Sequence, residues 1–210
     1  MTPRFAAVLG LLLLLLPFAS RATTPLPAPP VEGVNHATLD NPGSWQPVKQ
    51  GEIEVVEIFA YSCYHCADFA PMLEAWKARQ PKHVRVRYVS AAYDPLARGF
   101  FAAQRIGALP RTHLATFRAL HDERALPANA SDEELAAYYA GLGVDAKKLQ
   151  AALKGPQVDA DMRAAQAFTT RVGLQGTPTV IVAGRWRVLG GSLDELLQNT
   201  AALVANPPTP

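Results

Sequence analysis

The sequence predicts an α/β fold in which one sheet is interrupted by a block of helices. Three observations support this: a strand–helix–strand pattern up to residue 90, a stretch from Leu96 to about Val172 without strand character, and a return to strands followed by one last helix. We therefore expect a sheet domain formed by residues 51–90 and 174–206, with a helical domain inserted at residues 91–173.

The first 22 residues are typical of an export signal. Arg4 supplies a positive charge, Phe5 to Leu16 form an apolar run, and Ser20 and Ala22 place small residues at a cleavage site. The run is about a dozen residues long, short of the ~20 that a membrane-spanning helix needs. We expect residues 1–22 to be a cleaved signal peptide, with an uncleaved membrane anchor as the alternative.

The charge of the mature chain argues against nucleic acid as a partner. The full sequence carries a formal net charge of +2, and removing the signal takes away Arg4 and Arg21 but no acid, which leaves a balance of zero. A neutral chain has no general attraction for nucleic acid or anionic lipid. We expect no nucleic-acid binding.

A leader and a buried strand come next. Residues 23–50 contain six prolines and are predicted to be extended, with one short strand near residues 35–39. Residues 53–60 are apolar and β-branched, which is typical of a central strand. Glu57 interrupts this run, and a buried carboxylate is costly unless it is paired or protonated.

A helix should begin at Cys63. Four apolar residues follow at the spacing of one helical face: Phe69, Met72, Leu73 and Trp76. Pro71 lies within this helix and should kink it. Residues 83–90 alternate in polarity and predict the second strand of a β-α-β unit.

The remaining elements are marked mainly by their caps. Ser131 with Glu134 forms a capping box, and Asp145 is placed to cap a short helix. A longer helix follows Pro156 and ends near Gly173.

Two strands and a helix complete the chain. Residues 179–183 and 186–189 predict a hairpin. Ser192 with Glu195 caps a last helix over residues 193–204.

Cys63 and Cys66 are the only cysteines, and a C-x-x-C pair allows three interpretations. Zinc would need two further ligands, and the five histidines show no H-x₃₋₅-H pair. A structural disulfide would close a very small loop and restrain the unfolded chain weakly. Redox chemistry is favoured because a thiolate at a helix N-terminus faces free N–H groups and the positive end of the dipole. We predict no metal site.

The pair and its surroundings resemble a known family. The strand ending Glu57-Ile-Phe-Ala-Tyr, the sequence Cys63-Tyr-His-Cys66, Pro71 and the later Thr177-Pro178 are similar to the thioredoxin superfamily. The helical insertion resembles, more narrowly, the DsbA family of periplasmic thiol–disulfide oxidoreductases. The resemblance implies a thioredoxin-like fold and runs from about Val31 to Val204.

The resemblance assigns roles to particular residues. Cys63 would be the nucleophile, Cys66 the resolving thiol, and His65 the residue that stabilises the Cys63 thiolate. Glu57 would match a buried acid that modulates proton transfer. Pro178 would be a cis-proline that faces the disulfide.

Tyr64, Thr177 and Pro178 are the residues expected to contact the substrate, with Thr177 offering its backbone to an extended peptide. Tyr64 also departs from the best-known pattern, which has proline before the histidine, and Ala70 stands where some relatives have an acid.

Each assignment has a plainer alternative. Without the family context Pro178 would be expected to be trans, Glu57 could be a satisfied structural acid, and His65 a solvated loop residue. The other histidines are expected to be surface or packing residues: His36, His83, His113 and His121.

The resemblance, together with the export signal, thus implies a monomeric periplasmic oxidase that passes its Cys63–Cys66 disulfide to unfolded exported proteins and needs no other cofactor. Its electrons would go to a quinone-linked membrane oxidase resembling DsbB. The alternatives are a disulfide reductase, an isomerase or a peptide-binding chaperone. Known isomerase relatives carry an N-terminal dimerisation domain, for which residues 23–50 are too short.

Overall fold

The computed structural model describes residues 29–208. The expected signal peptide and the first part of the leader lie outside these residues. The strands are β1 (His36–Thr38), β2 (Ile53–Phe59), β3 (Val84–Ser90), β4 (Thr179–Val182) and β5 (Trp186–Val188). The helices are α1 (Tyr64–Lys77), α2 (Pro95–Arg105), α3 (Leu109–His121), α4 (Asp132–Gly141), α5 (Ala146–Leu153), α6 (Pro156–Arg171) and α7 (Leu193–Ala205).

All five strands form one sheet in the order β1-β5-β4-β2-β3. Strands β2 and β3 are parallel, as a strand–helix–strand unit requires, and the other pairs are antiparallel. In the parallel pair Glu57 lies opposite Tyr88, so both side chains point to the same face of the sheet. The predicted fold, a sheet with a helical insertion, is confirmed.

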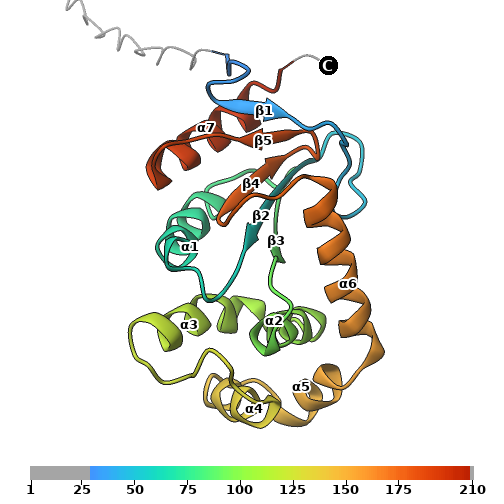
Figure 1. Ribbon diagram of the computed structural model, residues 1–210, viewed down its shortest axis with the longest axis vertical. Helices are drawn as coiled ribbons and strands as arrows, with labels where there is room; N and C mark the ends of the chain where they lie inside the picture. Colours follow the sequence, from blue (N-terminus) through green and yellow to red (C-terminus); the bar gives the residue numbers. More distant parts are fainter. Residues whose placement is uncertain (1–28, 209–210) are drawn as a thin grey trace, which may run out of the picture.

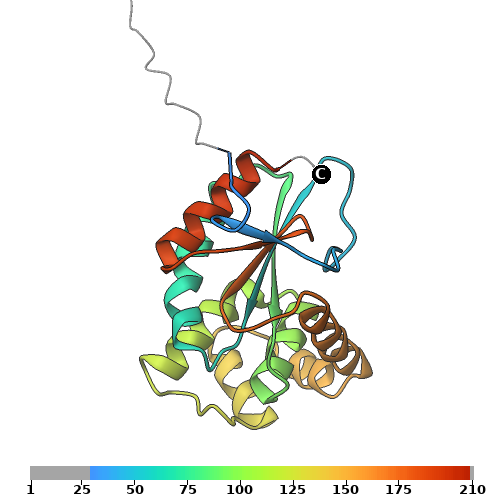
Figure 2. The same cartoon turned by 45° about the horizontal axis from the view of Figure 1, so that its top comes forward.

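Helices cover both faces of the sheet and one of its ends. Figure 2 shows α1 and α7 on one side of the sheet and α6 on the other. Helices α2 to α5 gather beyond the end of the sheet, and α6 returns the chain from them (Figure 1). The chain leaves the sheet at the end of β3 and re-enters it at the start of β4, and both points lie beside the carboxyl end of β2, which leads to Cys63.

Helix caps form where local sequence predicts them. Ser131 and Glu134 make a reciprocal capping box at the start of α4. Asp145 accepts a hydrogen bond from the Lys148 N–H at the start of α5, and Ser192 caps α7. Such caps stabilise a helix by about 1 kcal/mol each.

The leader is held against the sheet. Its short strand β1 pairs with β5 at the sheet edge, and the Gly43 N–H donates to the Gly184 carbonyl at 2.6 Å. Gly184 has a φ of +61°, and a Cβ there would lie 2.6 Å from the Gly43 carbonyl carbon. Only glycine fits this turn, because a side chain would force the leader away.

An aromatic cluster joins the sheet to the insertion. The Phe59 ring, at the end of β2, lies 5.0 Å from Phe100 of α2, 4.9 Å from His113 and 5.7 Å from Phe117, both of α3. Tyr61, two residues further on, packs 4.8 Å from Phe117. Pairs of this kind contribute about 0.5–1.5 kcal/mol beyond burial. The segment leading to Cys63 is therefore fixed on the helical insertion.

Candidate active site

Cys63 caps the N-terminus of α1. Its backbone is extended, with φ −85° and ψ 117°, and its Sγ accepts a hydrogen bond from the Cys66 N–H at 3.3 Å. No disulfide joins Cys63 and Cys66, so the structure represents the dithiol form. The Cys66 N–H, one of the free N–H groups of the first helical turn, therefore points at the Cys63 sulfur.

Thr177 and Pro178 approach Cys63 from far along the chain. The Cys63 S–H donates to the Thr177 carbonyl at 3.3 Å. The Thr177–Pro178 peptide bond is cis, as predicted. Pro178 also lines, together with His65 and Leu193, a groove of about 400 Å³.

The two thiols have different surroundings. Cys63 is half-buried, whereas Cys66 is wholly buried in the core. Burial raises the pKa of the Cys66 thiol well above its usual range, and the neighbouring Cys63 raises it further. Cys66 is thus held as a neutral thiol, and Cys63 is the sulfur within reach of a reactant.

Glu57 is a buried acid without hydrogen-bond partners. Its side chain is 0% exposed, and neither carboxyl oxygen has a partner within residues 29–208. Burial, followed by the negative charges of Glu74 and Cys63, raises the pKa of Glu57 to about 8. At neutral pH the group is mainly a protonated acid, which resolves the cost of burying a carboxylate in this strand.

Glu74 of α1 lies near Glu57 but is ionised. Burial alone would raise its pKa, yet hydrogen bonds from the Tyr88 hydroxyl and from Lys77 outweigh burial and lower it. The Lys77 Nζ lies 3.0 Å from Glu74 and 3.2 Å from the Tyr88 oxygen. Two neighbouring carboxyl groups therefore stand in different protonation states, a pattern typical of sites that move protons.

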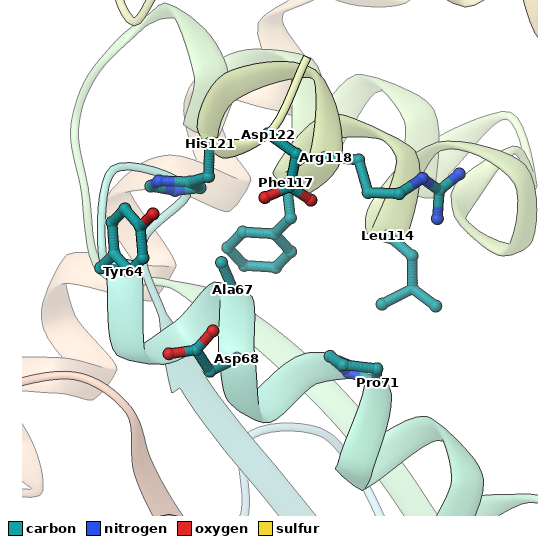
Figure 3. Close-up of a pocket in the computed structure, with 9 residues that line it drawn as sticks. All are labelled: Tyr64, Ala67, Asp68, Pro71, Leu114, Phe117, Arg118, His121 and Asp122. Carbon is teal, nitrogen blue, oxygen red and sulfur yellow. The ribbon is translucent and has the colours of Figure 1, made fainter. Parts of the chain in front are cut away.

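The two residues between the cysteines point into different environments. His65 is exposed and makes no hydrogen bond, ion pair or ring contact within the described part of the chain, so its effect on Cys63 stays a prediction. The Tyr64 ring is 64% exposed and packs edge-on against His121 of α3, with ring centroids 4.9 Å apart; Figure 3 shows the two rings together.

Two histidines of α3, His113 and His121, lie beside the site. From the sequence they were expected only to be surface or packing residues. His121 Nε2 lies 2.7 Å from the Tyr61 carbonyl oxygen, which can only accept, so Nε2 carries the proton. His113 is buried, with Nδ1 3.1 Å from the Tyr61 hydroxyl. Burial lowers its pKa to about 4, so the ring is neutral at pH 7.

The remaining histidines lie outside this cluster. His83 is exposed, and the buried His36 pairs with Glu32 at 2.9 Å. Within residues 29–208 no three His, Cys, Asp or Glu side chains gather in a way that could hold a metal ion. None of the helices described there is long and apolar enough to cross a bilayer.

Comparison with known proteins identifies this arrangement. The model of the DSBA-like thioredoxin domain matches residues 92–201, just over half of the chain. The chain belongs to the DsbA family. The thiol:disulfide interchange protein DsbA of Azotobacter vinelandii is 35% identical over 152 residues, 70% of each chain. DsbA of Burkholderia cepacia is 29% identical over 186 residues, 86% of this chain and 85% of the relative.

Solved DsbA structures share the fold. The crystal structure of the oxidoreductase DsbA from Xylella fastidiosa matches with a TM-score of 0.79 and 40% identity, covering 84% of this chain and 96% of that one. DsbA of Pseudomonas aeruginosa matches with a TM-score of 0.73 and 28% identity over 82% of this chain and 91% of the other. Both the family and the class of activity predicted from the sequence, thiol–disulfide oxidoreductase, are confirmed.

Proposed function

We propose that this DsbA-family chain is a periplasmic dithiol oxidase that donates a Cys63–Cys66 disulfide to exported proteins. The observation that carries the proposal is the placement of the Cys63 sulfur between the Cys66 N–H and the Thr177 carbonyl, at a helix N-terminus and half-open to solvent. It is the sulfur that a client thiol can reach, and it is the better leaving group of the pair.

The reaction would take place in two exchanges. A client thiolate attacks Cys63 Sγ of the disulfide, forms a mixed disulfide and expels Cys66 as a thiolate, which takes up a proton. A second client thiolate then attacks the client sulfur of the mixed disulfide and expels the Cys63 thiolate. The client loses two electrons and two protons, and the cysteine pair gains the two electrons.

The asymmetry of the pair favours this direction. Cys66 is buried and its pKa is raised, so it binds a proton as soon as it is released. Cys63 leaves as a thiolate stabilised by the N–H groups at the start of α1. A reduced form that is stabilised in this way makes the disulfide a stronger oxidant.

Glu57 is proposed to exchange protons with the Cys63–Cys66 pair. It is wholly buried, and the charge of Cys63 acts on its pKa, so its protonation responds to the redox state of the cysteines. With a pKa of about 8 it can hold or release a proton near neutral pH.

Thr177 is assigned to the client backbone. In the dithiol form its carbonyl accepts the Cys63 S–H. Once Cys63 is part of a disulfide that hydrogen is gone, and the carbonyl becomes free to accept an N–H from an extended client segment beside Pro178.

The reduction potential of the Cys63–Cys66 couple, measured by equilibration with glutathione, tests the direction. We expect a couple more oxidising than glutathione; a potential near that of thioredoxin would support a reductase instead.

Cys63→Ser should abolish oxidation of a reduced unfolded substrate, whereas unchanged activity would support the chaperone alternative. Cys66→Ser, in which Cys63 has no partner thiol to resolve the adduct, should accumulate a mixed disulfide when it is incubated with a client that already contains a disulfide.

The cellular setting follows from the same proposal. Clients would be unfolded exported proteins with free thiols, met by a monomer in the periplasm. Reoxidation would fall to a quinone-linked membrane oxidase resembling DsbB. The redox-active disulfide itself would serve in place of a cofactor.

A further inference from the structure

A second groove opens beside the cysteine pair, between α1 and α3. We call it the α1–α3 pocket; Ala67 and Pro71 of α1 and Leu114 and Phe117 of α3 form its apolar wall, and its volume is about 350 Å³. Figure 3 shows the Phe117 ring in the space between the two helices. A space of this size suits one large side chain and not a folded partner.

The pocket lies next to the site of disulfide exchange. Tyr64, the residue after Cys63, lies on its rim, whereas His65 lines the other groove, next to Pro178. A client segment bonded through its cysteine to Cys63 has two flanks. One flank can follow His65 and Pro178, and the other lies over Tyr64, at the entrance of the α1–α3 pocket.

The rim carries two carboxyl groups that have no neutralising partner in the described part of the chain. Asp68 lies on α1 and Asp122 at the end of α3; neither forms an ion pair or accepts a hydrogen bond through its side chain within residues 29–208. Arg118, also on the rim, lies 4.0 Å from Glu123, and its guanidinium points away from both aspartates (Figure 3).

This combination matches a long basic side chain. The methylene stem of a lysine or arginine can cover the apolar wall while its charged end stays near Asp68 and Asp122. The exposed Tyr64 ring adds a face on which a cation can rest. An acidic side chain would meet repulsion from both aspartates.

We propose that the α1–α3 pocket is a client subsite that holds a lysine or arginine flanking the client cysteine bonded to Cys63. The proposal rests on the proposed function and names a class of client for it. Clients with a basic residue near the reacting cysteine would be oxidised faster than those with a neutral or acidic one.

Matched peptides test the subsite. Each pair of synthetic dithiol peptides differs only by Lys or Gln two residues from one cysteine, on its amino side in one pair and on its carboxyl side in the other. The second-order rate of oxidation by the oxidised mature protein is measured for both members. In at least one pair we expect the Lys peptide to react about two- to fivefold faster, the size of an exposed ion-pair effect, and the preference to shrink in high salt.

Variants then locate the effect. Asp68→Asn and Asp122→Asn should each reduce the Lys-to-Gln rate ratio, and the double variant should bring it close to one. Glu133→Gln, which removes an exposed carboxylate from α4, should leave the ratio unchanged. The ratio is used because a change in the reactivity of Cys63 affects both peptides alike and cancels.

The outcomes separate the two proposals. Equal rates for Lys and Gln peptides in both pairs, or a preference that survives in the double variant, would overturn the subsite and leave the oxidase proposal standing. If the protein oxidised none of the peptides, the proposed function would fail, and the subsite with it.

Discussion

The ring of His121, at the end of α3, packs edge-on against the ring of Tyr64, the residue that follows the reactive cysteine. The same histidine donates a hydrogen bond to the Tyr61 carbonyl, two residues before Cys63. One side chain of the helical insertion therefore contacts the chain on both sides of Cys63. Tyr64 cannot restrict its own backbone as proline would, and His121 supplies part of that restraint from outside.

Replacing His121 should destabilise the protein. His121→Ala removes the hydrogen bond to Tyr61 and the ring contacts with Tyr64 and Phe117. The hydrogen bond and the Tyr64 pair alone are worth about 1–3 kcal/mol of unfolding free energy. Urea unfolding of the reduced protein would measure the loss. His121→Gln keeps a donor for the Tyr61 carbonyl and should recover part of it. His83→Ala, at an exposed histidine, is the control, and an equally small change in both alanine variants would contradict the restraint.

Glu57 should give stability an unusual dependence on pH. Its pKa is about 8 in the folded chain and near its ordinary value of 4.5 when unfolded, so between these pH values the native state binds one more proton than the unfolded chain. Stability contributed by the protonated acid is complete below about pH 4.5 and declines as the pH rises toward 8. The slope is at most about 1.4 kcal/mol per pH unit.

Glu57→Gln isolates this effect, because glutamine has the shape of the protonated acid and does not titrate. The unfolding free energies of both reduced proteins should be compared from about pH 5 to about pH 8, where the wild type should lose stability relative to the variant. Buried His113, with a pKa of about 4, titrates in both proteins and cancels in the difference. Parallel curves would mean that Glu57 does not carry the proton.

Alkylation should distinguish the two cysteines. Iodoacetamide added to the folded, reduced protein should label Cys63 first, because this sulfur is half-buried at the helix start while Cys66 is wholly buried as a neutral thiol. Peptide mapping would locate the label, and the unfolded protein, in which both cysteines should react, is the control. Comparable labelling of Cys66 in the folded state would reverse their assigned roles.

Glu54 should prove to be a structural acid. Its buried carboxylate accepts hydrogen bonds from the N–H groups of Trp45 (2.8 Å) and Gln46 (3.1 Å) and lies 3.4 Å from Arg87. Glu54→Ala leaves these donors unpaired and should cost about 3 kcal/mol of unfolding free energy.

Urea unfolding would measure the cost of Glu54→Ala, and Glu133→Ala on the surface of α4 serves as the comparison. The reduction potential should not move with Glu54→Ala, since its carboxylate is held by the leader and not by the cysteine pair. A shift in potential without a loss of stability would contradict this assignment.

Helix caps, helix starts and strands that depend on the local sequence could be predicted. The Ser131 capping box, the Asp145 cap and the strand of residues 53–59 depend on neighbours within a few positions, and each forms where its pattern predicts. The start of α1 at Cys63 follows from the same kind of signal. The start of α1 is central to the chemistry of the site, because its free N–H groups lie next to the Cys63 sulfur.

Contacts that depend on the packing of segments far apart in the chain could not be predicted from the sequence. No pattern in α3 indicates that His113 contacts Tyr61, or that His121 contacts both Tyr61 and Tyr64 on the two sides of Cys63, because only the packing of distant segments brings them together. Glu54 and Glu57 look alike in sequence, and both are buried. They differ because the leader folds back to supply hydrogen bonds to Glu54 and none to Glu57.

The surface around the cysteines comes from two separate stretches of the chain. Cys63, Cys66 and Glu57 belong to the strand–helix–strand unit, whereas Phe117, His121 and Asp122 belong to the segment that leaves the sheet after β3 and returns before β4. Mutations in that segment can reshape the rim of the site while leaving the electron-carrying atoms and their helix untouched. Part of the client-facing surface is then free to change in evolution while the cysteine pair stays the same.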